Sequence, residues 1–374
     1  MFKIKSQIRK LYASSVLSNL SLTGAWVAIL AARGFSLPEI GLAETAYHAA
    51  SLLTEIPSGT LADVFGRKRM LIISTLIHML AGVVMIVSND LFMVCLSIAL
   101  YAVCDSFASG SGDALAYDSL KTVGEEKRYE RYFSNQSIIY RVATGISTMC
   151  AGIALLLGYR ISYLISAATC FVTLLITFTL VEVDATGKRF KDQKNEVDNP
   201  MVLKTVMKKM GGYFGESIRF LIDNRKATKL MFANSFVGAI DILLLFFLQS
   251  KLNTAGISNR LLGLALFVMQ IGGVIGAKLI LKAKNVKYAK IFVVCTFGVL
   301  SGVLMEHTAS VVFMVLGGFI AAMADDALQI RTDAKLQDMF PSQQRATLIS
   351  ISSFTFSVIM IVLSPLAGYF FTIW

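Results

Sequence analysis

The chain alternates between long apolar runs and short polar connections. Eleven runs of about 20 residues carry few or no charges, and a helix needs about 20 apolar residues to cross the ~30 Å hydrocarbon core of a bilayer. Backbone polar groups in lipid must be satisfied within their own segment, so these runs predict transmembrane α-helices. The predicted spans are 11–32, 40–62, 70–87, 91–112, 134–157, 161–181, 228–249, 261–281, 289–305, 310–330 and 348–371. The predicted fold class is an all-α polytopic membrane protein.

Composition agrees with this interpretation. Hydrophobic residues make up 55% of the 374 residues and charged residues only 16%, whereas a soluble domain carries roughly 25% charged residues. The net charge of +11 follows from topology, because 30 of the 35 Lys and Arg residues fall in the N-terminus and in alternate connections. Positive residues accumulate on the cytoplasmic side of membrane proteins. We therefore expect a multi-pass protein of the cell membrane with a cytoplasmic N-terminus, and no nucleic-acid partner.

The sequence offers little evidence for an enzyme or for an ATP-driven pump. The five cysteines are scattered through apolar spans without metal-ligand spacing, so neither a metal nor a cofactor is expected. No G-x-x-x-x-G-K-[ST] loop is present, which excludes a primary ATP-driven pump of that type. The Asp325-Asp326-Ala-Leu-Gln segment lacks the second acidic residue of a D-D-x-x-D metal site. The sequence thus indicates a protein that is not an enzyme.

A polar stretch divides the spans into two groups. Residues 183–199 are charged and aperiodic, which is typical of a cytoplasmic linker. Apolar residues then recur at helical spacing over 203–221 with lysines opposite, which predicts either a basic amphipathic helix lying on the inner leaflet or an ordinary solvated linker helix. We expect an N-terminal six-helix half at 1–181, a linker at 182–227 and a C-terminal half with five helices at 228–374.

Weak internal repeats support two homologous halves. The segment 34–42, with Gly34, Ser36 and Gly41, recurs at 256–264 with an offset of 222, and Asp113-Ala-Leu recurs as Asp326-Ala-Leu. Parallel halves of this kind are a transporter design with substrate bound near the midplane. By the same offset the second half would lack its sixth span, which would place the C-terminus outside.

The connection between the second and third spans carries the most specific motif. Gly59-Thr-Leu-Ala-Asp63-Val-Phe-Gly66-Arg67-Lys68-Arg resembles the G-x-L-A-D-r-x-G-r-k signature of the major facilitator superfamily. The resemblance implies a two-half helical bundle, with twelve spans expected, and a latch in which Asp63 faces the N-terminus of the eleventh span and holds the cytoplasmic gate shut. The alternative is a positive-inside turn without a gating role.

Two other signatures of that family are missing. The fourth span lacks the arginine of R-x-x-q-G, and the fifth lacks the proline of G-P-x-x-G-G. These departures weigh against obligatory drug/proton antiport without excluding it.

Polar residues inside the spans are candidates for the transport pathway, because an Asp or Arg at a helix centre costs about 2.5–3.5 kcal/mol on insertion scales. Asp241 lies in the seventh span and its repeat mate Asn19 in the first. The resemblance implies that spans 1, 4, 7 and 10 line the cavity, where Asp105 and Trp26 would join them. Helix–helix hydrogen bonding is the alternative role.

The second and fifth spans add further candidates. Glu44 and His48, followed by Ser51 and Glu55, form one stripe along the second span. This stripe is either a proton relay or a packed hydrogen-bonding stripe. Arg141 is expected to neutralise Asp105 or Asp113.

The sequence thus predicts a secondary active transporter that works by alternating access. Proton-coupled efflux of amphiphilic or cationic compounds is favoured, since the predicted cavity carries more acid than base. The alternatives are an uptake permease for a small metabolite and a transport-inactive truncated family member. The expected partners are a small solute, protons and lipid, and the expected oligomeric state is a monomer.

Overall fold

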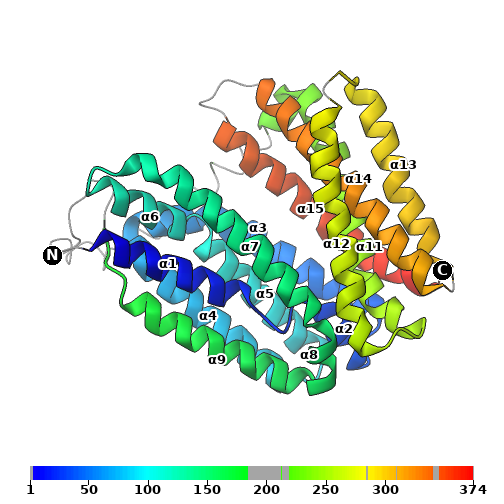
Figure 1. Cartoon of the computed structure of the whole chain (residues 1–374), viewed down its shortest axis with the longest axis horizontal. Coiled ribbons are helices and arrows are strands. Elements are labelled where there is room, and N and C mark those ends of the chain that lie inside the picture. Colours follow the sequence, from blue (N-terminus) through cyan, green and yellow to red (C-terminus); the bar gives the residue numbers. More distant parts are fainter. Residues whose placement is uncertain are drawn as a thin grey trace. The chain divides into compact units, whose positions relative to one another are not determined.

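The computed structural model describes residues 3–183, 212, 219–283, 285–308, 310–339 and 345–373, and every regular element among them is a helix (Figure 1). The helices are α1 (Ile4–Asn19), α2 (Trp26–Ala32), α3 (Leu37–Phe65), α4 (Arg67–Val87), α5 (Leu91–Ala108), α6 (Ser111–Lys121), the 3₁₀ turn η1 (Glu126–Arg128), α7 (Tyr129–Met149), α8 (Ala151–Leu157), α9 (Tyr159–Phe178), α11 (Arg225–Thr254), α12 (Asn259–Lys282), α13 (Tyr288–Glu306), α14 (Val311–Asp338) and α15 (Arg345–Ile373).

Each predicted span coincides with one of these helices or with a broken pair of them. Among the described residues, eight helices are long and apolar enough to cross a membrane, or nine when the bent pair α7–α8 is included. The all-α membrane fold is confirmed. The count of eleven spans stays a prediction, and the amphipathic linker helix at 203–221 lies outside the described residues.

Three spans that the sequence predicts as continuous are broken. Residues 20–25 separate α1 from α2, Ser109 and Gly110 separate α5 from α6, and α7 bends by 47° into α8. Gly110 has a φ of +71°, a conformation in which an L side chain is strained.

The first break is stabilised by a side chain from another span. The Ser21 amide donates to Ser147 Oγ at 2.9 Å, and that hydroxyl donates to the Asn19 carbonyl at 3.0 Å. Ser147 thereby satisfies two backbone groups that the interrupted helix leaves open, which is the condition for a broken helix at membrane depth.

The chain packs as two compact units. Unit 1 comprises Met1–Leu22, Ala46–Ser147 and Tyr159–Glu216, and unit 2 comprises Thr23–Thr45, Thr148–Gly158 and Ser217–Trp374, as far as these ranges are described. In unit 1, α4 packs against α5 and α9, and α1 packs against α9. In unit 2, α14 packs against α11, α12 and α13, and the short helices α2 and α8 lie on α11 and α12. The predicted boundaries of the two homologous halves stay a prediction.

Large apolar side chains cover the outward faces of the helices. Phe92, Val312 and Phe297 are 74%, 73% and 67% exposed. A soluble protein rarely exposes many such side chains together, whereas hydrocarbon solvates them. This surface belongs to a protein immersed in lipid.

The repeated turns before α3 and α12 share one backbone conformation. Gly34 and Gly256 both have a φ of +93°. Ser36 then donates to Glu39 Oε2 from both its amide and its hydroxyl, at 2.8 and 2.7 Å, which gives half of a capping box at the start of α3. Ser258, at the same place before α12, makes no side-chain cap bond. The two turns thus share a backbone conformation, and only the turn before α3 carries the cap.

Candidate transport site

Two buried carboxylates lie together in unit 2. Asp241 of α11 is 4% exposed and Asp325 of α14 is 8% exposed. Gly238, nearly one turn before Asp241, presents no side chain, and a Cβ built there would lie 3.3 Å from Asp325 Oδ1. The glycine therefore lets the Asp325 carboxylate approach the α11 backbone beside Asp241.

No basic side chain among the described residues pairs with these two carboxylates. Among the described residues, no ion pair includes Asp241 or Asp325, and Asp241 Oδ1 is buried without a hydrogen-bond partner. Asp326 is within electrostatic range of Asp241, and its carboxylate lies against Gly273 of α12. Acidic groups from α11 and α14 thus face one another inside the unit.

Asp325 was missed as a site residue. The sequence favours an interfacial position for Asp325 and Asp326 near the inner end of the tenth span, and for the buried Asp325 that interpretation is wrong. The available signal was a pair of adjacent aspartates that are the only charged residues in the sequence between Val311 and Ile330 of α14.

Unit 1 contains a polar cavity of about 700 Å³. Three of the predicted pathway residues line it together, namely Asn19, Asp105 and Arg141. Asp105 is exposed to this cavity and accepts a hydrogen bond of 2.9 Å from the Tyr47 hydroxyl of α3. Asn19, at the end of α1, donates to the Ser15 carbonyl at 2.8 Å. The walls of the cavity come from α1, α4, α5, α6, α7 and α9.

The expected pairing of Arg141 with a carboxylate is wrong. Arg141 is exposed, and among the described ion pairs it contacts neither Asp105 nor Asp113. All three side chains line the same cavity. The guanidinium therefore belongs to the open surface of the cavity and not to a closed internal ion pair.

The other predicted pathway residues occupy packed positions. Trp26 contacts Phe246 edge-on within unit 2, with ring centroids 5.6 Å apart. Glu44 and His48 are both buried on α3, and the His48 ring packs edge-on against Tyr47 at 5.4 Å. Tyr47 also donates a hydrogen bond to Asp105, which lines the unit 1 cavity, so the Tyr47 side chain connects His48 to a cavity residue.

The signature loop is held by two acidic side chains of unit 1. Gly66 adopts a φ of +91° and opens α4, and the Glu182 carboxylate accepts hydrogen bonds from the amides of Arg67 and Lys68 at 3.0 Å each. Arg67 also forms an ion pair with Asp118 of α6, which is buried. Glu182 therefore caps α4, a role that the sequence did not reveal because Glu182 follows α9, more than a hundred residues away.

The latch itself stays a prediction. Gly59 and Asp63 lie on α3, but their side-chain surroundings lie outside the described residues.

The acidic cap of the signature loop is partly buried. Burial raises the pKa of Glu182, and the hydrogen bonds from the backbone amides of Lys68, Arg69 and Arg67 counteract this increase. The turn is thus a partly desolvated charge network.

The corresponding loop of the second half is fastened differently. Arg331, near the inner end of α14, donates to the backbone carbonyl of Ala283 in the turn after α12. In the first half the loop supplies the arginine and the helix supplies the acid. In the second half the helix supplies the arginine and the loop supplies only a carbonyl.

Close backbone contacts join first-half segments to second-half helices within unit 2. Each contact centres on a glycine at which a Cβ would overlap a carbonyl of the neighbouring segment. The pairs are Gly41 with Ser364, Gly368 with Leu37, Gly152 with Asn259 and Gly263 with Met149. Gly41 and Gly263 are mates in the predicted repeat. We call the contacts of α3 with α15, and of α12 with α8 and the end of α7, the glycine seams.

A family model provides the deciding comparison. The model of the Major Facilitator Superfamily matches residues 11–330. The chain belongs to the Major Facilitator Superfamily. It is therefore a multi-pass membrane transporter and not an enzyme, as the signature loop predicted.

Individual relatives agree. The chain is 21% identical over 354 residues to the MFS-type transporter YxaM of Bacillus subtilis (strain 168), covering 91% of this chain and 84% of that protein. A mutant form of the nucleoside transporter NupG superposes with a TM-score of 0.75 at 15% identity, covering 96% of this chain and 90% of that one. A D-xylose-proton symporter gives 0.66 at 11% identity, covering 97% and 88%. Likenesses at this identity show a shared fold.

Proposed function

We propose that this superfamily member is a proton-coupled secondary transporter that exports cationic or amphiphilic solutes by alternating access. The observation that carries the proposal is the pair of buried carboxylates, Asp241 and Asp325, without a described cationic partner. Family membership supports transport, and the pair supports the coupling.

A proton is the simplest ligand for this pair. Like charges close together cannot both stay ionised at low cost, and burial penalises each charge further. A cationic solute that reaches these carboxylates would compensate the same charge and displace the proton. Competition between proton and cation for one acidic site gives antiport without any additional coupling element.

The polar cavity of unit 1 supports the choice of solute. Two carboxylates, those of Asp105 and Asp113, line the cavity together with one guanidinium, that of Arg141. Arg141 forms no ion pair with another described residue. A low-dielectric cavity with excess carboxylate favours cations. The chain shares its fold with a D-xylose-proton symporter, which supports proton coupling as a mechanism available to this fold. That protein's name describes movement of solute and proton in the same direction, whereas we propose movement in opposite directions.

Alternating access needs a closure at each end of the spans. Gly41 lies near the start of α3, a helix of 29 residues, and the signature loop follows the end of the same helix. The glycine seams therefore serve as the outer closure, and the loop around Gly66 with the predicted Asp63 latch serves as the inner one.

Replacing Asp241 with Asn separates coupling from folding. An unpaired buried carboxylate stabilises nothing, so the variant should melt in detergent at the parent temperature or above, and export of ethidium from proteoliposomes along a pH gradient should be lost. Asp325→Asn should behave alike. Asp338→Asn, an exposed residue at the end of α14, makes the same charge change and should transport normally. A destabilised Asp241→Asn protein that binds ethidium as tightly as the parent would contradict the assignment.

A further inference from the structure

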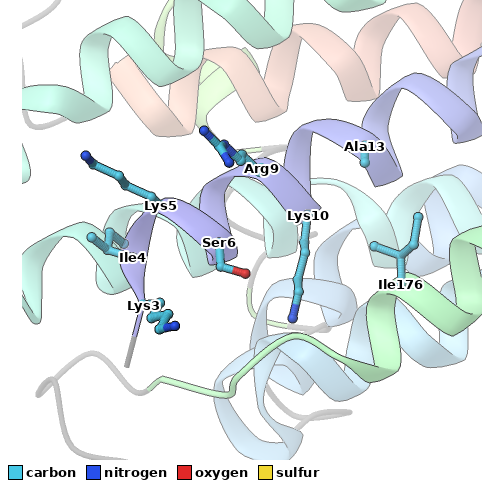
Figure 2. Close-up of a pocket in the computed structure, with 8 residues that line it drawn as sticks. All are labelled: Lys3, Ile4, Lys5, Ser6, Arg9, Lys10, Ala13 and Ile176. Carbon is cyan, nitrogen blue, oxygen red and sulfur yellow. The ribbon is translucent and has the colours of Figure 1, made fainter. Parts of the chain in front are cut away.

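A second cavity of about 700 Å³ lies at the start of α1, on the side of unit 1 where the chain enters its first span. Four cationic side chains line it together with a hydroxyl and apolar groups (Figure 2). The lining residues are Lys3, Ile4, Lys5, Ser6, Arg9, Lys10, Ala13 and Ile176. None of them lines the cavity that contains Asn19, Asp105 and Arg141.

Within the described part of the chain, nothing compensates the positive charge of this pocket. None of the described residues that line the pocket is acidic, and none of its four cations forms an ion pair with another described residue. Lys10 is held in place, because its ammonium group donates to the carbonyl of Thr179 after α9 at 2.9 Å. Figure 2 shows Lys5 and Arg9 along one flank of α1 and Lys10 along the other, with Ser6 between them. An anion at the pocket would meet donors from both sides of α1.

The pocket changes in character along α1. Its cations all precede the first predicted span, which begins at residue 11, whereas Ala13 of α1 and Ile176 of α9 fall within predicted spans. A ligand that fills it would place an anionic group among the lysines and an apolar chain along the helices. Basic pockets between transmembrane helices at the membrane surface bind anionic lipid head groups.

We infer that this pocket is a binding site for an anionic phospholipid. The phosphodiester lies among Lys3, Lys5 and Arg9 at the membrane–water boundary and can accept from the Ser6 hydroxyl. One acyl chain follows the groove between Ala13 and Ile176. A soluble phosphate would use the cations but gain nothing from the apolar wall.

The test compares lipid binding by matched charge-deletion variants. Lys3→Gln, Lys5→Gln and Arg9→Gln are combined, leaving Lys10 and its bond intact. The control combines Lys278→Gln, Lys282→Gln and Lys290→Gln, three exposed lysines of unit 2. Detergent-purified proteins are titrated with phosphatidylglycerol or phosphatidylcholine, and bound lipid is counted by native mass spectrometry.

The parent and the control should retain phosphatidylglycerol in preference to phosphatidylcholine. Each basic residue near an anionic lipid contributes about 1 kcal/mol, so the α1 triple variant should bind phosphatidylglycerol on the order of 100-fold more weakly. Its melting temperature without added lipid should equal that of the parent, which shows that it folds.

Three results would overturn the inference. They are equal phosphatidylglycerol affinity of the α1 variant and the parent, equal binding of phosphatidylcholine, or displacement of the lipid by an equal concentration of glycerol 3-phosphate, which would assign the site to a soluble anion. The readout needs no transport, so the result is independent of the role of Asp241.

Discussion

At the scale of single residues, the sequence pointed to one member of the acidic pair and not to the other. Asp241 stands alone in an apolar run, and its insertion cost made it a candidate. Asp325 lies close enough to the basic end of its span to pass for an interfacial residue. Only the packing of α14 against Gly238 shows that its carboxylate is buried. The sequence predicts where a residue lies along its span, but it does not predict which side chains of two different spans face each other.

The half capping box before α3 gives a residue-scale prediction with an internal control. Glu39→Ala removes both bonds to Ser36 and should destabilise the start of α3 by about 0.3–1.5 kcal/mol, measured as a lower melting temperature in detergent. Ser258→Ala, on the equivalent turn without a cap bond, should change stability less. An equal effect of the two substitutions would contradict the role of the cap.

The same bonds predict a pH dependence. The Ser36 hydroxyl and amide lower the pKa of Glu39 below its ordinary value of 4.5. A carboxyl whose pKa is lowered in the folded state contributes stability above its unfolded pKa and loses it as the pH falls through the folded value. The difference in melting temperature between parent and Glu39→Ala should therefore be full at pH 7 and should shrink below pH 4.5. A difference that grows on acidification would contradict this.

At the scale of elements, the pattern of apolar runs predicted where helices lie but not where they break. Ser147, more than a hundred residues away from Ser21, satisfies the backbone at the first break. Glu182 caps α4 from a comparable distance in sequence. Both partners come from other spans, so no local window of sequence contains them.

The glycine seams lead to an element-scale prediction. Gly41→Ala and Gly263→Ala place a Cβ on a carbonyl of the neighbouring segment, so each should weaken the closure at its seam. A cysteine introduced beside the seam should then react faster with a membrane-impermeant maleimide. Gly82→Ala is the control, because a Cβ there meets only ordinary contacts at 3.6 Å or more. Equal labelling rates in all three variants would rule out a gating role for the seams.

The signature loop allows structural and gating residues to be separated. Asp118→Asn breaks the buried pair with Arg67 and should cost about 3–5 kcal/mol, seen as a marked drop in melting temperature. Asp63→Asn, if Asp63 serves as the latch, should leave expression and melting temperature intact while transport falls and a cysteine probe at the loop labels faster. Unchanged transport and unchanged labelling in Asp63→Asn would leave Asp63 as a surface residue.

At the scale of the whole molecule, three features of the sequence sufficed for the family: the run of spans, the loop from Gly59 to Lys68 and the distribution of positive charge. The solute and the direction of transport depend on which side chains of different spans share a cavity. Asn19, Asp105 and Arg141 line the same cavity. They come from three different helices, and how those helices pack cannot be read from the sequence of any one of them. Proton-coupled export therefore stays a proposal.

The most direct measurement is proton movement driven by solute. Proteoliposomes that contain a trapped pH-sensitive dye receive external ethidium, and protein-free vesicles give the background. Antiport predicts that ethidium enters while protons leave, so the lumen becomes alkaline with the parent and with Asp338→Asn, and stays unchanged with Asp241→Asn. Entry of ethidium with no change of luminal pH in the parent, or an equal change in Asp241→Asn, would contradict proton coupling through the buried carboxylates.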